Sequence, residues 1–226
     1  MAVAFIVGMV KTQSGYTFRE EVGNTITHIL GMMFSVCATS VLVTLSCFWG
    51  DCWSIVSCAI FGASMLLVYT ASSVYHAVQN ERAKQLLKKL DHIAIYYLIA
   101  GSYTPFLLVP MRSELGWWMF GIVWGLALAG TLLKIFMPPS GTKLWSVGLY
   151  LAMGWLIVFV SGKLFACIPG VSIVFLILGG LFYSVGIVFY IKKNWEFSHA
   201  IWHMFVLLGT MMHFFSVLFA CVRTEV

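Results

Sequence analysis

Long apolar stretches joined by short polar segments fill almost the whole chain. Seven of these stretches reach the roughly 20 residues that a helix needs to cross a bilayer. They lie near residues 22–48, 53–78, 90–110, 115–137, 144–166, 171–191 and 198–221. The pattern predicts an all-α membrane protein, a seven-transmembrane helix bundle over residues 22–221. Only the short segments 1–21 and 222–226 flank it, so we expect the bundle itself to carry the function.

The composition agrees with an integral membrane protein. The 226 residues are 61% hydrophobic and 9% charged, and the mean hydropathy of +0.96 is outside the range of soluble domains. The net charge of +5 comes without the basic patch and interleaved aromatic residues that nucleic-acid binding would require. We therefore expect membrane lipid, and no nucleic acid, as the partner. A homo-oligomer is left open.

The positive charges are distributed unevenly between the two ends of the predicted helices. Ten Lys and Arg residues fall on the side of the N-terminus: Lys11, Arg19, Arg82, Lys84, Lys88, Lys89, Lys134, Lys143, Lys192 and Lys193. Three fall on the other side: Arg112, Lys163 and Arg223. Because basic loops are retained in the cytoplasm, this predicts a cytoplasmic N-terminus and a C-terminus outside. We interpret the charges themselves as solvated loop residues.

Three histidines lie inside apolar stretches, His76 near the end of the second and His199 and His203 near the start of the last. An ionisable side chain there costs roughly 2.5 kcal/mol or more unless it faces protein, water or a ligand. At about 1.5 Å of rise per residue the three imidazoles share one depth near the cytoplasmic face. His199 and His203, four residues apart, also share one helix face. The set favours a tetrahedral Zn²⁺ site with an open fourth position, as in catalytic zinc.

Two further polar residues are placed to assist such a site. Residues 196–203 lack the glutamate of the His-Glu-x-x-His metalloproteases, so a general base has to come from another helix. Asp91, at the start of the third stretch, could accept a proton, hold a water or ligate the metal, and the sequence leaves these alternatives open. Ser72, one turn from His76, could hydrogen-bond a substrate carbonyl or the water on the metal. We interpret Asp91 and Ser72 as candidate catalytic residues.

Glu21, Asn24 and His28 recur at positions i, i+3 and i+7 and form one stripe at the start of the first stretch. One interpretation is an acidic residue at a helix start with a polar interface behind it. The other is a polar wall or second shell beside the metal. The sequence does not decide between them.

Two other features leave alternatives open. The six cysteines contain no Cys-x-x-Cys and lie away from the histidines, so we interpret them as packing residues, with a Cys47–Cys52 bridge across an outer turn as the alternative. Residues 1–10 are apolar but too short to span a membrane, and we do not interpret them as a signal peptide. The natural start could be Met9 rather than Met1.

Five motifs together carry a family resemblance: EEVGNTITH at 20–28, SSVYH at 72–76, LKKLDH at 87–92, AGSYTPF at 100–106 and HAIWH at 199–203. From about Lys11 to its end the chain resembles the hemolysin III family, the bacterial branch of the progestin and adipoQ receptor group, itself grouped with the alkaline ceramidases. The resemblance implies seven helices with a cytoplasmic N-terminus, zinc on the three histidines, and roles for Ser72 and Asp91. The long cytoplasmic domain of the eukaryotic receptors is absent, which argues against a hormone-receptor role.

The leading hypothesis is a zinc-dependent hydrolase of a lipid amide or ester in the bacterial inner membrane. It rests on the open three-histidine site and on the analogy to ceramidases. The alternative is a non-catalytic membrane protein, active in lipid homeostasis, sensing or cytolysis, in which zinc is structural. A channel or transporter ranks third, because no charged residue marks a path at mid-membrane.

Overall fold

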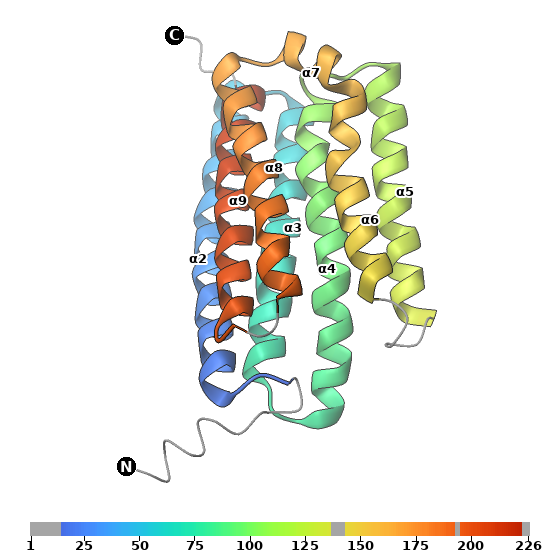
Figure 1. Cartoon of the computed structure of the whole chain (residues 1–226). Helices are drawn as coiled ribbons and strands as arrows, with labels where there is room; N and C mark the ends of the chain where they lie inside the picture. Colours follow the sequence, from blue (N-terminus) through green and yellow to red (C-terminus); the bar gives the residue numbers. More distant parts are fainter. Residues whose placement is uncertain (1–14, 137–142, 193–194, 223–226) are drawn as a thin grey trace.

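Every regular element of the protein is helical in the part that the computed structural model describes, residues 15–136, 143–192 and 195–222. The elements are α2 (Phe18–Trp49), α3 (Cys52–Ala77), α4 (Glu81–Leu108), α5 (Glu114–Phe136), α6 (Lys143–Trp155), the 3₁₀ helix η1 (Leu156–Val160), α7 (Ser161–Cys167), α8 (Gly170–Ile191) and α9 (Ser198–Cys221). Figure 1 shows them running side by side along one axis. The predicted segment 1–10, a start at Met9, and residues 223–226 of the tail lie outside the described residues.

Within the described residues, six helical segments are long and apolar enough to cross a membrane: α2, α3, α5, α8, α9 and the combined segment Trp145–Cys167. The protein is therefore a multi-pass integral membrane protein. The remaining long helix, α4, covers most of the predicted stretch 90–110 but begins nine residues before it. Five of these nine added residues are charged. The start of α2 and the end of α9 lie at opposite ends of the bundle (Figure 1). Seven crossings and the orientation of the termini stay predictions.

Side-chain caps fix where the first three helices begin. At α2 the Thr17 hydroxyl accepts from the Glu20 N–H at 3.2 Å, and the Glu20 carboxylate accepts from the Thr17 N–H at 2.8 Å. Asp51 caps α3 and Asn80 caps α4 in the same way, through one side-chain oxygen each. Such caps satisfy N–H groups that have no partner inside the helix. The caps at Thr17 and Asn80 hold the first turns of α2 and α4, where site residues lie.

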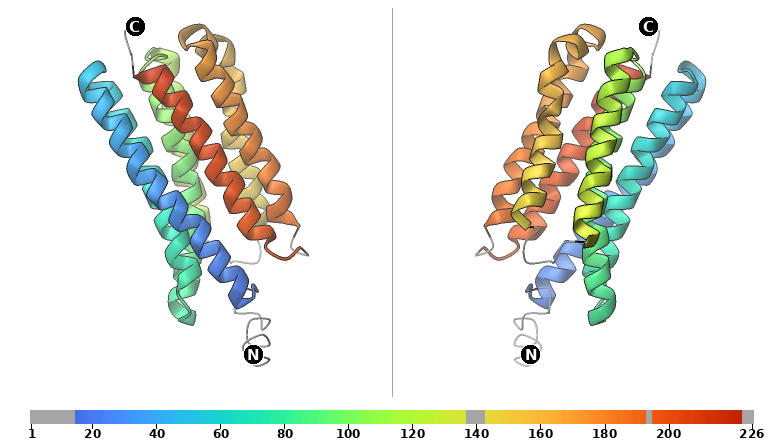
Figure 2. Two further views of the ribbon diagram at one scale, coloured as in Figure 1. Left: turned by 90° about the vertical axis from the view of Figure 1, so that its left-hand side faces the viewer. Right: turned by 90° about the vertical axis from the view of Figure 1, so that its right-hand side faces the viewer.

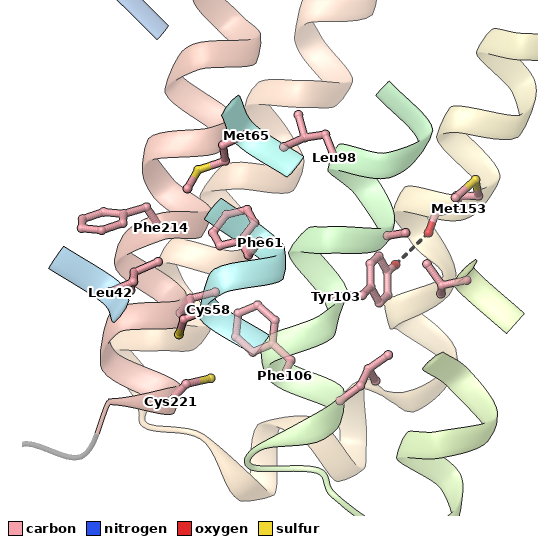
Figure 3. Packing of buried hydrophobic residues seen from close by; sticks show 14 of the residues in the cluster. Leu42, Cys58, Phe61, Met65, Leu98, Tyr103, Phe106, Met153, Phe214 and Cys221 are labelled. Atoms are coloured by element: carbon pink, nitrogen blue, oxygen red, sulfur yellow. Dashed lines mark hydrogen bonds between the residues drawn. The ribbon is translucent and has the colours of Figure 1, made fainter. Parts of the chain in front are cut away.

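The core lies between α3, α4 and α9, with α2 against α3 and α9 on one side and α5 and α6 on the other (Figures 1 and 2). Figure 3 shows Phe61 and Met65 of α3, Leu98 and Phe106 of α4, and Phe214 of α9 gathered in one cluster, with Met65 pointing toward Phe214. Lipid does not drive apolar side chains together, so close packing and polar contacts have to hold such helices. Small and hydroxyl-bearing residues are accordingly frequent in the contacts.

The predicted stretch 144–166 is one span in length but not one regular helix. It changes from α-helix to the 3₁₀ helix η1 after Trp155 and returns to α-helix at Ser161. The Tyr103 hydroxyl of α4 donates to the Met153 carbonyl at 2.8 Å, drawn in Figure 3, and accepts from the Ile157 N–H at 2.9 Å. This side chain satisfies backbone groups that the break leaves without a helical partner. The apolar pattern alone carries no sign of it.

Close helix contacts use glycine where a large side chain crosses. A Cβ on Gly31 of α2 would lie 2.3 Å from the Tyr69 ring of α3, and one on Gly179 of α8 would lie 2.1 Å from the His213 ring of α9. Ser172 and Ser216 also join α8 to α9, each hydroxyl donating to the other residue's carbonyl at 2.7 Å. Hydrogen bonds of this kind replace the hydrophobic driving force between helices in lipid.

The bundle exposes large apolar side chains on its outer face, as a lipid-facing surface requires. Trp118 and Trp145, near helix ends, are 67% and 78% exposed, as expected for interface anchors. All six cysteines are free, so the structure contains no Cys47–Cys52 bridge. Only Cys58 and Cys221 are buried, and the interpretation as packing residues applies to these two.

Substituting Gly31→Ala should destabilise the bundle by a net 1–2 kcal/mol or so. The added methyl would overlap Tyr69, which is fully buried and held by a 2.7 Å hydrogen bond to Thr210. Overpacking of this kind costs about 1–3 kcal/mol. The better helix propensity of Ala offsets about 1 kcal/mol or less of that cost. Thermal unfolding in detergent measures the effect. Gly121→Ala is the control, since a Cβ there meets nothing within 4 Å and the Tm should hold or rise. Equal Tm changes in the two variants would contradict the prediction.

Candidate metal centre

The structure brings His76, His199 and His203 together. Each offers one ring nitrogen, and these three atoms all lie within 4.8 Å of one another. His76 comes from the last turns of α3, and the other two come from the first turns of α9. The start of α9 is in turn tied to α2, because the Phe197 N–H donates to Glu20 Oε1 at 3.3 Å. The sequence prediction that these histidines converge from two helices is confirmed.

His76 is oriented by a carboxylate on α2. Its Nδ1 lies 2.6 Å from Glu21 Oε2, and both side chains are almost completely buried. Because a carboxylate only accepts hydrogen bonds, His76 Nδ1 has to carry the hydrogen. The lone pair of a neutral His76 is then on Nε2, on the far side of the ring. Asn24, one turn along α2, lies 3.5 Å from the same Nδ1.

His203, like His76, is oriented by a side chain of α2, here a hydroxyl group. Its Nδ1 lies 3.2 Å from Thr27 Oγ1, and the Thr27 hydroxyl donates its one hydrogen to the Asn24 carbonyl at 2.8 Å. Thr27 can therefore only accept from His203 Nδ1–H, which again leaves the lone pair on Nε2. Nε2 of His76 and Nε2 of His203 are both buried and have no hydrogen-bond partner.

These observations fit a divalent metal ion. Buried polar atoms without partners are rare in folded proteins, and two of them beside a third imidazole need an explanation. Zinc binds neutral imidazole nitrogens, and the other nitrogen of a ligating histidine usually donates to a carboxylate or another oxygen acceptor. Glu21 and Thr27 are such acceptors. The residues present therefore suit a cation held by His76, His199 and His203.

Aromatic side chains pack against the histidine cluster. The Tyr16 ring stacks on His199, with the ring centroids 4.8 Å apart and an interplanar angle of 26°, and lies 6.2 Å from the His76 ring. Burial raises the pKa of Tyr16, an effect that nearby Tyr75 and Tyr190 reinforce, so its phenol stays neutral. Trp202 packs against His199 and His203 from the other side.

An apolar cavity of about 250 Å³ extends from the centre between α4, α6, α8 and α9. Its lining includes His28 and Trp202, which contact the histidine cluster, together with Asp91. Asp91 and Phe106 of α4 both line it, so it follows roughly 22 Å of that helix at about 1.5 Å per residue. A cavity of this length, lined mostly by apolar side chains and reaching the histidine cluster at one end, suits a chain-like apolar molecule with a polar head.

Comparison with known proteins bears on this arrangement. The family model described as "Haemolysin-III related" matches residues 16–214. The chain belongs to this haemolysin-III related family. It is 46% identical over 208 residues to "Hemolysin-3 homolog" of Bacillus subtilis (strain 168), covering 92% of this chain and 97% of the relative. It is 40% identical to "Hemolysin-3" of Bacillus cereus over 206 residues, 91% of this chain and 94% of the relative.

A more distant relative is "Monocyte to macrophage differentiation factor" of Homo sapiens, 28% identical over 219 residues, which are 89% of this chain and 84% of that protein. The family resemblance that the five motifs suggested is thus confirmed. All five motifs, at 20–28, 72–76, 87–92, 100–106 and 199–203, fall inside the region that the haemolysin-III related model matches.

The other predicted site residues occupy different places around the centre. Glu21 is 1% exposed and contacts His76, so it lies beside the histidine cluster. The His28 ring lies 3.8 Å from that of His203, and neither of its nitrogens has a partner. Ser72 is buried on α3. Asp91 faces the cavity and is outside the group of three ligand atoms.

Three neighbours of the centre are absent from the sequence prediction. Thr27 lies within the motif at 20–28, and Tyr16 precedes the first predicted stretch. The interpretation of Lys84 as a solvated loop charge is wrong. It is only 6% exposed and its Nζ lies 2.7 Å from Glu21 Oε1. A basic residue in a joint between helices gives no sequence signal of such a contact.

Substituting Glu21→Gln should weaken binding of a divalent cation by roughly 10- to 100-fold, because the carboxylate that orients His76 is lost. The protein is stripped with a chelator, and Zn²⁺ affinity is measured by competition with a fluorescent indicator. Glu81→Gln at the exposed start of α4 removes the same charge away from the centre and should leave the affinity unchanged. Equal affinities in wild type and Glu21→Gln would show that Glu21 does not support the metal.

Proposed function

We propose that this haemolysin-III related protein is a zinc-dependent hydrolase of a lipid amide or ester in the bacterial inner membrane. The observation that carries the proposal is the pair of buried, unpartnered Nε2 atoms on His76 and His203, beside His199 and next to the apolar cavity. Three imidazole ligands leave a fourth position on zinc for water or substrate. Zinc held there would polarise a substrate carbonyl and make water acidic enough to attack at neutral pH.

Each group of residues around the centre would then have a separate role in the reaction. His76, His199 and His203 hold the ion, while Glu21 and Thr27 keep the ligand rings in place. Asp91, in the cavity wall, would accept the proton of the attacking water and pass it to the leaving amine or alcohol. Ser72 donates a hydrogen bond to the substrate carbonyl oxygen and stabilises its developing negative charge.

The cavity supports a lipid as the substrate. Its walls are mostly apolar side chains of α4, α6, α8 and α9, and at one end His28 and Trp202 bring it next to the histidine cluster. An acyl chain lying along α4 would bring its head group to that end. The apolar walls would also keep bulk water away from the reacting carbonyl, which strengthens electrostatic interactions there.

One observation favours a non-catalytic alternative. The three histidines come from α3 and α9, and Glu21 comes from α2, so a metal ion would tie three helices together as a structural site does. The name "Hemolysin-3" of the Bacillus cereus relative suggests a role in membrane lysis. A structural zinc should raise the Tm strongly on binding, and catalytic variants should then leave the cellular phenotype intact.

Asp91→Asn should retain the metal and lower turnover by roughly 10²- to 10⁴-fold, the usual contribution of a general base. Purified protein, loaded with or stripped of zinc, is incubated with a panel of lipid amides and esters, and the products are measured by mass spectrometry. Asp51→Asn is the matched control, because Asn caps a helix as well as Asp and this position caps α3 on the far side of the bundle. Its turnover should equal that of wild type.

Two outcomes would contradict the enzymatic proposal. The first is a zinc-loaded wild type that converts no lipid amide or ester in the panel. The second is a folded, zinc-loaded Asp91→Asn protein with full activity, which would remove Asp91 from the chemistry.

Substituting Gly180→Leu should reduce turnover of long-chain substrates at least tenfold and spare short-chain ones, because the new side chain would occupy the cavity. Gly180 lines the cavity, and a Cβ there meets nothing within 4 Å. Gly121→Leu on α5 is the control, since that glycine is equally open but faces away from the cavity. Turnover is compared across acyl-chain lengths, together with the zinc content. An identical chain-length profile in all three proteins would exclude the cavity as the acyl site.

A further inference from the structure

Lys84 lies at the meeting point of three helices. Its Nζ lies 2.7 Å from Glu21 Oε1 of α2 and donates to the Val78 carbonyl at the end of α3 at 3.1 Å. The ammonium group also lies over the Tyr75 ring, 5.3 Å from its centroid. A lysine that is 6% exposed and has three such contacts is not a solvated loop charge.

Glu21 connects Lys84 to the centre. One oxygen of its carboxylate faces Lys84 Nζ, and the other faces His76 Nδ1 at 2.6 Å. The Glu21 side chain is 2% exposed, so its negative charge has little access to water. A buried carboxylate needs a compensating charge, and breaking such a pair is strongly destabilising. Lys84 places a positive charge in direct contact with this carboxylate.

We propose that Lys84 is a positioning residue of the metal centre, the internal counter-ion that holds Glu21 in place in the metal-free protein. The site is thereby assembled before the metal arrives. Lys84 and the bound cation then share the charge of Glu21, so Lys84 lowers the affinity for the metal and keeps the site exchangeable. This inference rests on the metal site of the proposed function.

The direction of the effect follows from charge. Removing Lys84 takes away a positive charge in contact with Glu21 in the metal-free state, whereas a divalent cation on His76 brings positive charge close to Glu21 in the loaded state. The repulsion between the ammonium and the cation also disappears. Both terms favour the loaded state, and at an effective dielectric constant of about 20 or more they amount to roughly a tenfold gain in affinity. A residue that only supported the fold would destabilise both states equally.

The experiment compares full-length wild type, Lys84→Met, Lys84→Arg and Lys89→Met, each with excess chelator and with Zn²⁺. Lys84→Met should lose far more of its Tm in chelator than in zinc, and it should bind Zn²⁺ roughly tenfold more tightly than wild type in indicator competition. Lys84→Arg keeps the charge and should behave as wild type. Lys89→Met removes an exposed charge from the same helix and should change neither measurement.

If Lys84→Met is recovered only when zinc is present, Lys84→Gln, which keeps hydrogen-bond donors but no charge, serves in its place, and recovery that depends on zinc supports the inference. Equal Tm losses with and without zinc, or an affinity no higher than that of wild type, would overturn it while the metal site stands. A wild type that binds no divalent cation would instead overturn the proposed function. The two failures are thus distinguished.

Discussion

The contact between the Glu21 carboxylate and His76 Nδ1 is the constraint on which the centre depends. It fixes the tautomer of His76, leaves the lone pair of a neutral ring on the buried Nε2, and joins α2 to α3 beside the histidine cluster. Placing a carboxylate in a membrane bundle is costly, so the same contact requires a positive charge nearby. Lys84 meets that requirement, and the burial of one acidic residue therefore organises the first turns of α2 and α4 and the last turns of α3.

The helical period turns short motifs into this geometry. Residues Glu21, Asn24 and His28 lie on one face of α2, and all three are almost completely buried against the cluster. His199 and His203 lie one turn apart on α9, and their ring centroids are 4.4 Å apart. The capped starts of α2 and α4, and the hydrogen bond from the Phe197 N–H to Glu20, fix where along the bundle axis the site residues of α2, α4 and α9 lie. The centre is thus set by where helices begin as much as by which residues they carry.

The sequence predicts the helices and the histidine cluster well because each leaves a local signal. Apolar length marks the helices, and an ionisable residue in an apolar stretch is conspicuous. Lys84 and Thr27 leave no such signal, because a loop-side lysine and a helical threonine are ordinary residues until the fold brings them to Glu21 and His203. The 3₁₀ break at Leu156 depends on a hydroxyl of another helix, Tyr103, which no local pattern near residue 156 could reveal.

The polar first half of α4 has a structural reason. Its buried face carries Lys84 and Asp91, seven residues apart and therefore on one stripe. Lys84 contacts Glu21, which in turn contacts His76, and Asp91 lines the cavity. One stripe of α4 thus supplies a positive charge to the carboxylate that orients a metal ligand and a negative charge to the cavity wall.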